Sequence, residues 1–257
     1  MEILFYLLLV GSGERQIVCE KLVEEIEVSE RVCFVGYSQY PSIYISILNN
    51  DKDMQLAISH MDITEKLNES FIHSKYKSIN DSKAIVIDTN LSTEAIDFIT
   101  RTYCHVPIFV DTVSTAKCLK IKNILSRFEA IKLNKYESET LSNIKIENLD
   151  DVKKSAQYFL DKGIKNVFIT LGSDGVYCAN NKEMFHIPGV KIDIINATGA
   201  GDAFMSGIVY GFMNDFNLNE TAKFAISSSL VALSHKNTIN PNFSVDLINK
   251  TIKEFNL

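Results

Sequence analysis

The sequence predicts an α/β protein of three layers, in which helices cover both faces of a mostly parallel β-sheet. Short continuous apolar runs alternate with amphipathic helical patterns over most of the 257 residues, as is typical of parallel strands buried on both faces. Hydrophobic residues make up 46% of the chain and charged residues 23%, which suits a globular domain with one substantial core. We therefore expect a single domain over residues 1–257.

Five apolar runs bounded by turn residues are predicted as strands, at residues 3–10, 84–87, 107–110, 130–132 and 166–171. Helical periodicity predicts helices at residues 15–25, 93–100, 120–127, 152–162, 200–212, 218–234 and 245–254, and another after Asn134. The first run has the hydrophobicity of a signal peptide, but Glu2 stands where a basic residue belongs, and a charged helix follows. We expect a buried strand, no membrane segment and a cytoplasmic protein.

The segment 42–60 departs from this alternation. Ile43, Ile45 and Ile47 alternate with other side chains, residues 49–51 are turn formers, and an apolar stretch returns at 56–58. This period-two pattern predicts an antiparallel hairpin with one covered face. Such a hairpin can act as a lid or a dimer contact, and an edge hairpin without a role is an equal alternative.

Charge and cysteine spacing exclude several classes of function. The formal net charge is −6 and the pI is near 5.4, whereas nucleic-acid binding requires a basic face, so no nucleic-acid partner is expected. The five cysteines and five histidines lack the spacing of a metal or redox site. We expect free thiols and no metal held by direct protein ligands.

The strongest chemical signal is the segment Asn196-Ala197-Thr198-Gly199-Ala200-Gly201-Asp202-Ala203-Phe204. Its small residues let a ligand approach the backbone, and the helix that begins there presents N–H groups and a positive dipole end, which suit a phosphate. Asp202 lies in the first turn, where a carboxylate stays ionised and can accept the proton of an attacking hydroxyl. The alternative is a glycine-rich turn whose aspartate only favours the helix.

This segment closely resembles the signature of the ribokinase-like family, also called phosphofructokinase-B kinases, and further motifs follow in the family's order. The resemblance implies a ribokinase-like fold, Asp202 as catalytic base, and an anion hole formed by the backbone of Gly199, Ala200 and Gly201. It also implies ATP and Mg²⁺ as cofactors and a small sugar or nucleoside as the phosphoryl acceptor.

Asn134 and Glu137 resemble the family's Asn-x-x-Glu motif, which helps to place magnesium and the ATP phosphates, largely through water. The spacing of three residues puts both side chains on one face of a helix. An asparagine followed three residues later by glutamate is also the pattern of a capping box. One pair of residues can serve both purposes.

The turn after the strand at 166–171 resembles the family's ATP site, and its matching residues are Thr170, Gly172, Ser173 and Gly175. A strand-ending turn without a ligand is the alternative. Asn240 is expected either to close the nucleotide site or to form a simple turn with Pro241. Many family members have an aspartate at the position of Asn196 that helps to hold K⁺, so Asn196 and Thr198 are candidates for a monovalent-cation site.

Softer matches resemble the pseudouridine kinase branch of the family and imply phosphorylation of the 5′-hydroxyl of pseudouridine. They are Asn196, Asp111-Thr112-Val113-Ser114, Thr238-Ile239-Asn240-Pro241 and Met61-Asp62-Ile63. Ribose, fructose and adenosine are alternative acceptors. A catalytically inactive, truncated nucleotide-binding homologue is the alternative from another class.

The resemblance begins at about Gly11, after the point where family members have supplied a first strand and residues that grip the sugar. We therefore expect the first core strand and part of the lid to be missing. Losing a strand exposes a sheet edge and favours self-association. A fragment, a decayed paralogue and a kinase completed as a homodimer are the three interpretations.

Overall fold

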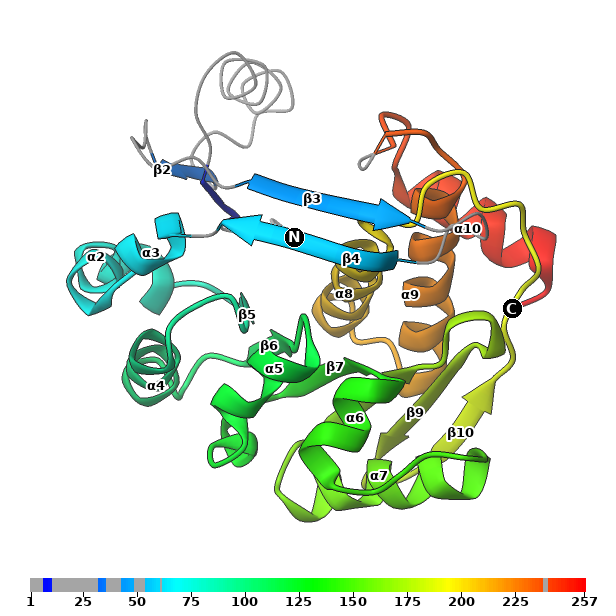
Figure 1. Cartoon of the computed structure of the whole chain (residues 1–257), viewed down its shortest axis with the longest axis horizontal. Helices are drawn as coiled ribbons and strands as arrows, with labels where there is room; N and C mark the ends of the chain where they lie inside the picture. The colour runs from blue at the N-terminus through cyan, green and yellow to red at the C-terminus, as the bar shows by residue number, and fades with distance from the viewer. Residues whose placement is uncertain (1–6, 11–31, 36–42, 49–53, 61, 238–239) are drawn as a thin grey trace. The chain divides into compact units, whose positions relative to one another are not determined.

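The computed structural model describes residues 7–10, 32–35, 43–48, 54–60, 62–237 and 240–257 (Figure 1). The chain divides into two compact units. Unit 1 comprises residues 1–85 and 90–107, and unit 2 comprises residues 86–89 and 108–257. The expectation of one domain over residues 1–257 stays a prediction.

Unit 1 contains two small sheets and several helices. β1 (Leu7–Val10) pairs in parallel with β2 (Val32–Val35), and β3 (Ile43–Leu48) pairs antiparallel with β4 (Met54–His60). The strands of the predicted hairpin are thus confirmed, whereas its turn and the helix predicted at 15–25 lie outside the described residues. The helices described are η2 (Asp62–Lys66), α2 (Glu69–Ser74), α3 (Tyr76–Asn80) and α4 (Thr93–Thr102).

A six-stranded sheet with the order β10-β9-β8-β7-β6-β5 forms the centre of unit 2. Its strands are β5 (Ile85–Asp88), β6 (Ile108–Asp111), β7 (Ala130–Asn134), β8 (Asn166–Thr170), β9 (Val176–Asn180) and β10 (Met184–Ile187). Strands β6, β7 and β8 are parallel, as the continuous apolar runs predict. Strands β9 and β10 add an antiparallel edge that the sequence does not predict.

Helices lie on both faces of this sheet (Figure 1). The longer ones are α6 (Lys135–Ser142), α7 (Leu149–Asp161), α8 (Ala200–Met213), α9 (Leu218–Leu233) and α10 (Val245–Phe255). Phe168 of β8 packs edge-on against Phe204 of α8, with ring centroids 6.1 Å apart. Because side chains alternate along a strand, Val167 and Ile169 face the opposite layer.

The segment between β6 and β7 is less regular than expected. Instead of one helix at 120–127, the chain forms α5 (Thr115–Cys118) and two short 3₁₀ turns, η3 (Leu119–Ile121) and η4 (Leu125–Arg127). Ile121 and Leu125 are buried, so the apolar residues that suggest a helix are used by separate turns that pack into the core. The apolar pattern covers too few residues to specify whether an α-helix or a 3₁₀ turn forms.

Helices α8 and α9 pack closely because glycines of α8 face α9. A Cβ atom added at Gly207 would lie 2.5 Å from the Cα atom of Ala225, and one added at Gly211 would lie 2.6 Å from Thr221 Oγ1. Neither position has room for a side chain without movement of the partner helix. This contact fixes the direction of α8, and therefore the place where its first turn meets the sheet.

Candidate active site

Polar residues end each of the parallel strands of unit 2. Asp111 ends β6, Asn134 ends β7 and Thr170 ends β8. Thr170 Oγ1 donates a hydrogen bond to the Leu133 carbonyl at 3.2 Å, which joins the ends of β7 and β8. Open α/β sheets bind ligands at the carboxyl ends of their strands, so this edge is the candidate site.

Helix α8 begins without a side-chain cap. Its N-cap is Gly199, whose φ of 87° is a left-handed conformation that suits glycine. Every other helix of six or more residues labelled α in the described chain has an asparagine or serine N-cap that accepts a backbone N–H. At α8 the Ala200 N–H makes only a long contact of 3.4 Å with the Ala197 carbonyl. The first N–H groups of this helix therefore suit an anionic ligand.

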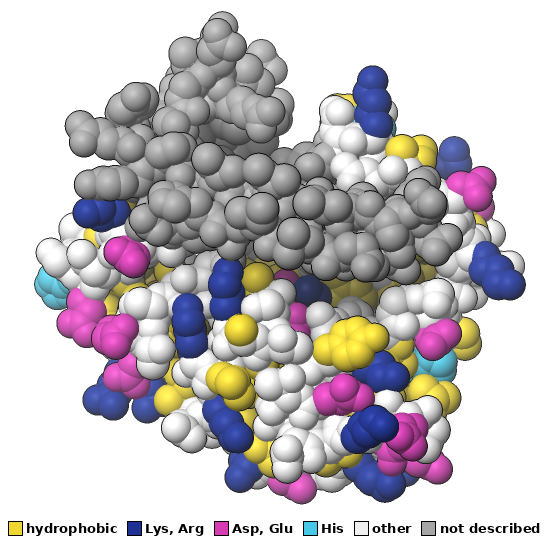
Figure 2. Space-filling model, viewed as in Figure 1, with side chains coloured by type: hydrophobic (Ala, Val, Ile, Leu, Met, Phe, Trp, Pro, Cys, Tyr) yellow, Lys and Arg dark blue, Asp and Glu magenta, His cyan; other side chains and the backbone are white. Residues whose placement is uncertain are grey.

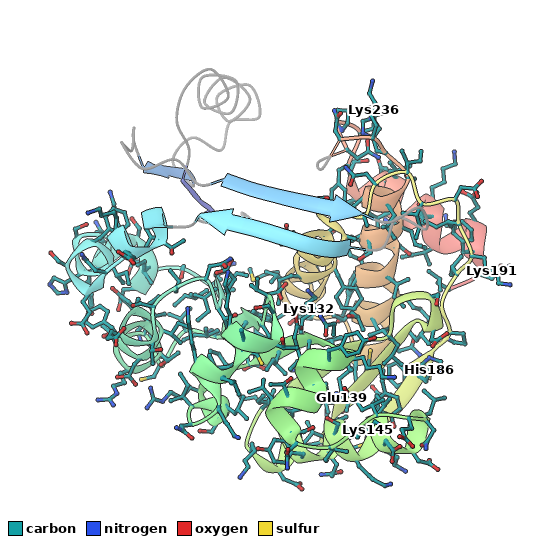
Figure 3. All side chains as sticks on the ribbon, in the orientation of Figure 1. Lys132, Glu139, Lys145, His186, Lys191 and Lys236 are labelled. Carbon is teal, nitrogen blue, oxygen red and sulfur yellow. The ribbon has the colours of Figure 1, made fainter. Side chains whose placement is uncertain are left out.

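A buried ion pair lies against the start of α8. Lys132 Nζ donates to Asp111 Oδ2 at 2.8 Å, and both side chains are 12% exposed. A Cβ atom added at Gly201 would lie 2.8 Å from Lys132 Nζ, so the glycine leaves room for the ammonium group. The Lys132 side chain is 12% exposed, whereas that of Lys145 is 79% exposed; both residues are labelled in Figure 3. The motif segment thus meets a cation that comes from β7.

Asp202 lies in the first turn of α8 and is accessible to solvent, as its predicted role as a base requires, and this role stays a prediction. The surrounding protein nevertheless restricts hydration of its carboxylate, and this desolvation raises its pKa above the usual range. The negative charge of Asp111 raises the pKa further, Lys132 opposes the shift, and Asp88 adds a smaller increase. These influences act against the helix end, which alone would favour the ionised form.

Asp111 also shapes the turn after β6. Its Oδ1 atom accepts the N–H of Val113 at 3.0 Å, and Ser114 N–H donates to the Thr112 carbonyl at 2.6 Å. Val113 has φ 58°, which is rare for a β-branched residue and belongs to a strained kind of γ-turn. One oxygen of Asp111 therefore holds a strained turn, and the other holds Lys132.

Asn134 and Glu137 form a complete capping box at the start of α6. Glu137 is 2% exposed, and its carboxylate accepts hydrogen bonds from the Asn134 N–H at 2.7 Å and from Asn134 Nδ2 at 2.8 Å. Thr112 Oγ1 donates to it at 2.6 Å. The capping interpretation is confirmed, and the role of the pair at magnesium stays a prediction.

The turn after β8 depends on glycine conformations. It contains η5 (Gly172–Asp174), with φ 62° at Gly172 and φ 96° at Gly175. A Cβ atom at Gly175 would lie 2.5 Å from the backbone nitrogen of Gly189, so the turn packs tightly on the segment after β10. Thr170 precedes this turn and Ser173 lies within it, and their contact with a nucleotide stays a prediction.

The remaining predicted residues shape loops. Asn240 is buried, donates from Nδ2 to the Val231 carbonyl at 3.1 Å and accepts Asn242 N–H at 2.9 Å, as the simple-turn alternative requires. Asn196 accepts the Thr198 N–H at 2.9 Å and donates to the Lys236 carbonyl at 3.1 Å. The predicted roles of Asn240 at the nucleotide and of Asn196 and Thr198 at a cation are not tested by these contacts.

A model of one protein family matches residues 9–244, and its description is pfkB family carbohydrate kinase. The chain belongs to this family. Pseudouridine kinase of Escherichia coli is 35% identical over 214 residues, which cover 83% of this chain and 68% of that enzyme. The present chain thus spans about two thirds of the length of this relative.

Solved structures share the fold of this pfkB chain. A provisionally named sugar kinase of Clostridium perfringens has a TM-score of 0.82 and 27% identity, covering 98% of this chain and 80% of that one. A provisionally named ribokinase II of Escherichia coli, solved with ATP and Mg²⁺, has a TM-score of 0.77 and 15% identity, covering 96% of this chain and 82% of that one. The fold is therefore ribokinase-like, as predicted.

The described surface of this pfkB chain is mixed in charge. Figure 2 shows acidic and basic side chains interspersed over its visible face. Among residues 62–237 and 240–257 and the four described strands before them, no helix has the length and apolarity that a bilayer crossing needs. The same residues contain no group of three His, Cys, Asp or Glu side chains able to hold a metal ion.

The proximity of Lys132 to the start of α8 is a feature of the candidate site that sequence reasoning misses. Lys132 lies 70 positions before Asp202, at the end of an apolar run predicted only as a strand. The available signal was a lysine in a buried strand two residues before Asn134, since a buried cation needs a partner. That signal does not identify Gly201 as the neighbour, because this contact arises only when β7 and α8 pack.

Proposed function

We propose that the chain is a kinase that transfers the γ-phosphoryl group of ATP, with Mg²⁺, to a hydroxyl of a nucleoside or sugar. The observation that carries the proposal is Asp202 in the first turn of a helix whose uncapped start borders Lys132. A solvent-accessible carboxylate beside groups that attract phosphate is the arrangement that phosphoryl transfer requires. Membership of the pfkB family supports the same reaction class.

The acceptor that we propose is pseudouridine, phosphorylated at its 5′-hydroxyl. The support is the similarity to the Escherichia coli pseudouridine kinase over 83% of the chain. Ribose, fructose and adenosine are the competing acceptors, since substrate preference depends on a few pocket contacts rather than on the fold.

The residues present fit ATP and Mg²⁺. The N–H groups at Gly199, Ala200 and Gly201 would hold a phosphate, because no side chain caps them. The turn containing Thr170, Gly172, Ser173 and Gly175 would hold the nucleotide, with Asn240 near its far side. Glu137 and Asn134 would reach Mg²⁺ through water. Bound ATP supplies the phosphoryl group, and Mg²⁺ neutralises charge on its phosphates.

In this mechanism Asp202 accepts the proton of the acceptor hydroxyl as its oxygen attacks. General-base work of this kind contributes roughly 10²–10⁴-fold in rate. The backbone N–H groups at the start of α8 stabilise the charge that develops on the transferred group. The raised pKa of Asp202 makes its carboxylate the stronger proton acceptor once it is ionised.

The test is an ADP-release assay of the full chain with Mg·ATP against pseudouridine, uridine, adenosine, ribose and fructose. Turnover with pseudouridine and a loss of about 10²–10⁴-fold in Asp202→Asn are expected. Faster turnover with another acceptor would correct the substrate, and ATP binding without any turnover would select the inactive-homologue alternative. Repeating the assay in K⁺ and in Na⁺ tests the cation site predicted at Asn196 and Thr198.

A further inference from the structure

Lys132 occupies an electrostatically unusual place. The N-terminus of a helix carries a partial positive charge of about half an elementary charge, so an ammonium group is unfavourable there. Lys132 Nζ nevertheless lies where a Cβ atom of Gly201, the second residue of α8, would be only 2.8 Å away. The ammonium group and the helix end repel each other unless an anion lies between them.

The negative charge of Asp111 compensates for part of this repulsion, and Asp111 also holds Lys132 in a fixed position. It ends β6, accepts the Lys132 ammonium at 2.8 Å and accepts the Val113 N–H with its other oxygen at 3.0 Å. The pair therefore ties Lys132 to a strained turn at φ 58° instead of leaving the lysine free to turn away from α8. Strained backbone that the surroundings hold in place is characteristic of functional sites.

The chemistry at this position is defined by Asp202, which follows Gly201 directly. Of the phosphates of ATP, the γ-phosphoryl group is the one that must lie beside the base and its acceptor. A cation next to Gly201 therefore faces the transferred group more closely than the α- or β-phosphate. A lysine at this point can stabilise negative charge on the γ-phosphoryl group, because its ammonium group has three N–H donors.

We propose that Lys132 is a further catalytic residue, which contacts the γ-phosphoryl group during transfer, and that Asp111 is its positioning residue. This inference rests on the proposed kinase function. In the step, the bond between the γ-phosphorus and the bridging oxygen breaks, and ADP leaves with its electron pair. A bond from the acceptor oxygen to phosphorus forms, the hydroxyl proton passes to Asp202, and Lys132 keeps its proton throughout.

The competing explanation is that Lys132 and Asp111 form a structural ion pair. Removing one partner of a buried pair leaves the other charge uncompensated and destabilises the fold. The principal variants are therefore Lys132→Met and the double variant Asp111→Asn/Lys132→Met, in which neither charge remains. Lys132→Arg preserves the charge. Lys145→Met is the control, because Lys145 is 79% exposed and pairs with the exposed Glu147.

The first experiment measures binding of Mg·ADP and of a non-hydrolysable Mg·ATP analogue by calorimetry, with circular dichroism to verify folding. In Lys132→Met and in the double variant, affinity for the ATP analogue should fall by about 10–100-fold, with ADP affinity nearly unchanged. Lys132→Arg should retain part of the preference for the triphosphate, and Lys145→Met all of it. Equal losses for both nucleotides, or no loss in a folded variant, would overturn the proposal.

The second experiment measures kcat and KM for ATP with the best acceptor. Lys132→Met should lower kcat by about 10²–10³-fold, as loss of a charge-stabilising donor does. Asp111→Asn keeps an oxygen for the Val113 N–H but releases Lys132, so kcat should fall about tenfold without weaker ATP binding. A parallel rise of KM would instead indicate a merely structural role for Asp111.

These results separate the two proposals. If the wild-type chain binds the ATP analogue but phosphorylates no acceptor, the kinase function fails, and the comparison of ATP with ADP still decides whether Lys132 contacts the γ-phosphate. If the wild-type chain turns over and the Lys132 variants match it, the kinase function holds and the role of Lys132 fails. A chain that binds neither nucleotide contradicts both.

Discussion

At the scale of single residues, the charges that lie close to the Asp202 carboxylate determine its pKa. Asp202 is accessible, yet desolvation and Asp111 raise its pKa while Lys132 lowers it. The glycine-rich motif places Asp202, the proposed base, but the two neighbours that shift its pKa most, Asp111 and Lys132, come from β6 and β7. Changes to these neighbours should therefore alter the pH dependence of the proposed reaction, even though neither is the proposed base.

The pH dependence of kcat/KM should show an acid limb that reports ionisation of Asp202, above the pH of an ordinary aspartate at about 3.9. Because the ionised form is the base, activity should fall as the pH decreases through this pKa. Asp111→Asn removes a charge that raises the pKa, so the limb should move to lower pH; Lys132→Met should move it to higher pH. Shifts in the same direction for both variants would contradict this account.

Gly201→Ala should separate folding from catalysis. The added Cβ atom meets only the flexible end of Lys132, and alanine is the better helix former by about 0.5–1 kcal/mol, so thermal stability should be kept or raised. Displacing the ammonium group should cost about 10²-fold in kcat. Combining Gly201→Ala with Lys132→Met should cost little more than either change alone. Fully multiplicative losses would show that the two residues act independently.

Among the secondary-structure elements, α8 and α6 differ in how their first turns are completed. Helix α6 is closed by the Asn134–Glu137 capping box and by Thr112, all within the protein. Helix α8 has a glycine at the same point and no such closure. The two helices beside the candidate edge thus have opposite roles, one structurally complete and one open to a ligand.

Glu137→Gln should destabilise the fold by about 1–3 kcal/mol, because a glutamine has one acceptor oxygen for the three donors that the buried carboxylate satisfies. The matched control is Glu220→Gln, in the exposed capping box that Asn217 and Glu220 form at α9, where glutamine is tolerated. Urea unfolding of both variants measures the difference. Mg²⁺ titrations of activity on Glu137→Gln test its predicted magnesium role, and an unchanged magnesium dependence would leave only the cap.

Gly207→Ala should push α8 away from α9, because the new Cβ atom would lie 2.5 Å from the backbone of Ala225. Overpacking of this kind costs about 1–3 kcal/mol, more than the helix propensity that alanine adds. Ser206→Ala, at the exposed neighbouring position of α8, is the control and should be nearly neutral. Thermal denaturation of the two variants is the measurement; equal midpoints would show that the helices separate at no cost.

The elements differ in how well the sequence predicts them. Parallel strands β6 to β8 and helices α7 to α10 are predicted because long periodic patterns and buried runs specify them. Strands β9 and β10 are missed because no α-helix separates them from β8, so the alternation of strands and helices does not mark them. Helices α2 and α3 are missed because five or six residues carry too little helical periodicity. The helix that begins at the glycine-rich segment, with Asp202 in its first turn, is local in sequence and is predicted, whereas the contact of Lys132 with Gly201 depends on tertiary packing.

For the whole molecule, all residues of the proposed donor site belong to unit 2. They come from β6, β7, the turn after β8 and the first turn of α8, and Asn240 follows α9. Unit 1 contributes none of the predicted site residues. Nucleotide binding should therefore slow hydrogen exchange in segments of unit 2 alone, although these segments lie far apart in the sequence.

Mg·ATP at about 100 times its Kd should raise the free energy of unfolding by about 2.7 kcal/mol. Hydrogen exchange measured by mass spectrometry should slow in peptides covering 130–137, 170–175 and 196–209. Peptides from α2 and α3 should exchange as before, and AMP, which lacks the β- and γ-phosphates, serves as the control for the first turn of α8. Protection confined to unit 1 would contradict the location of the site.

The uncapped start of α8 has a practical consequence for biochemistry on this protein. Backbone N–H groups that no side chain satisfies attract any small tetrahedral oxyanion, whatever its origin. Sulfate and inorganic phosphate in purification buffers would therefore compete with nucleotide, raise the apparent KM for ATP and increase the melting temperature. Samples exchanged into chloride or acetate buffers give the reference state against which ligands of this chain should be compared.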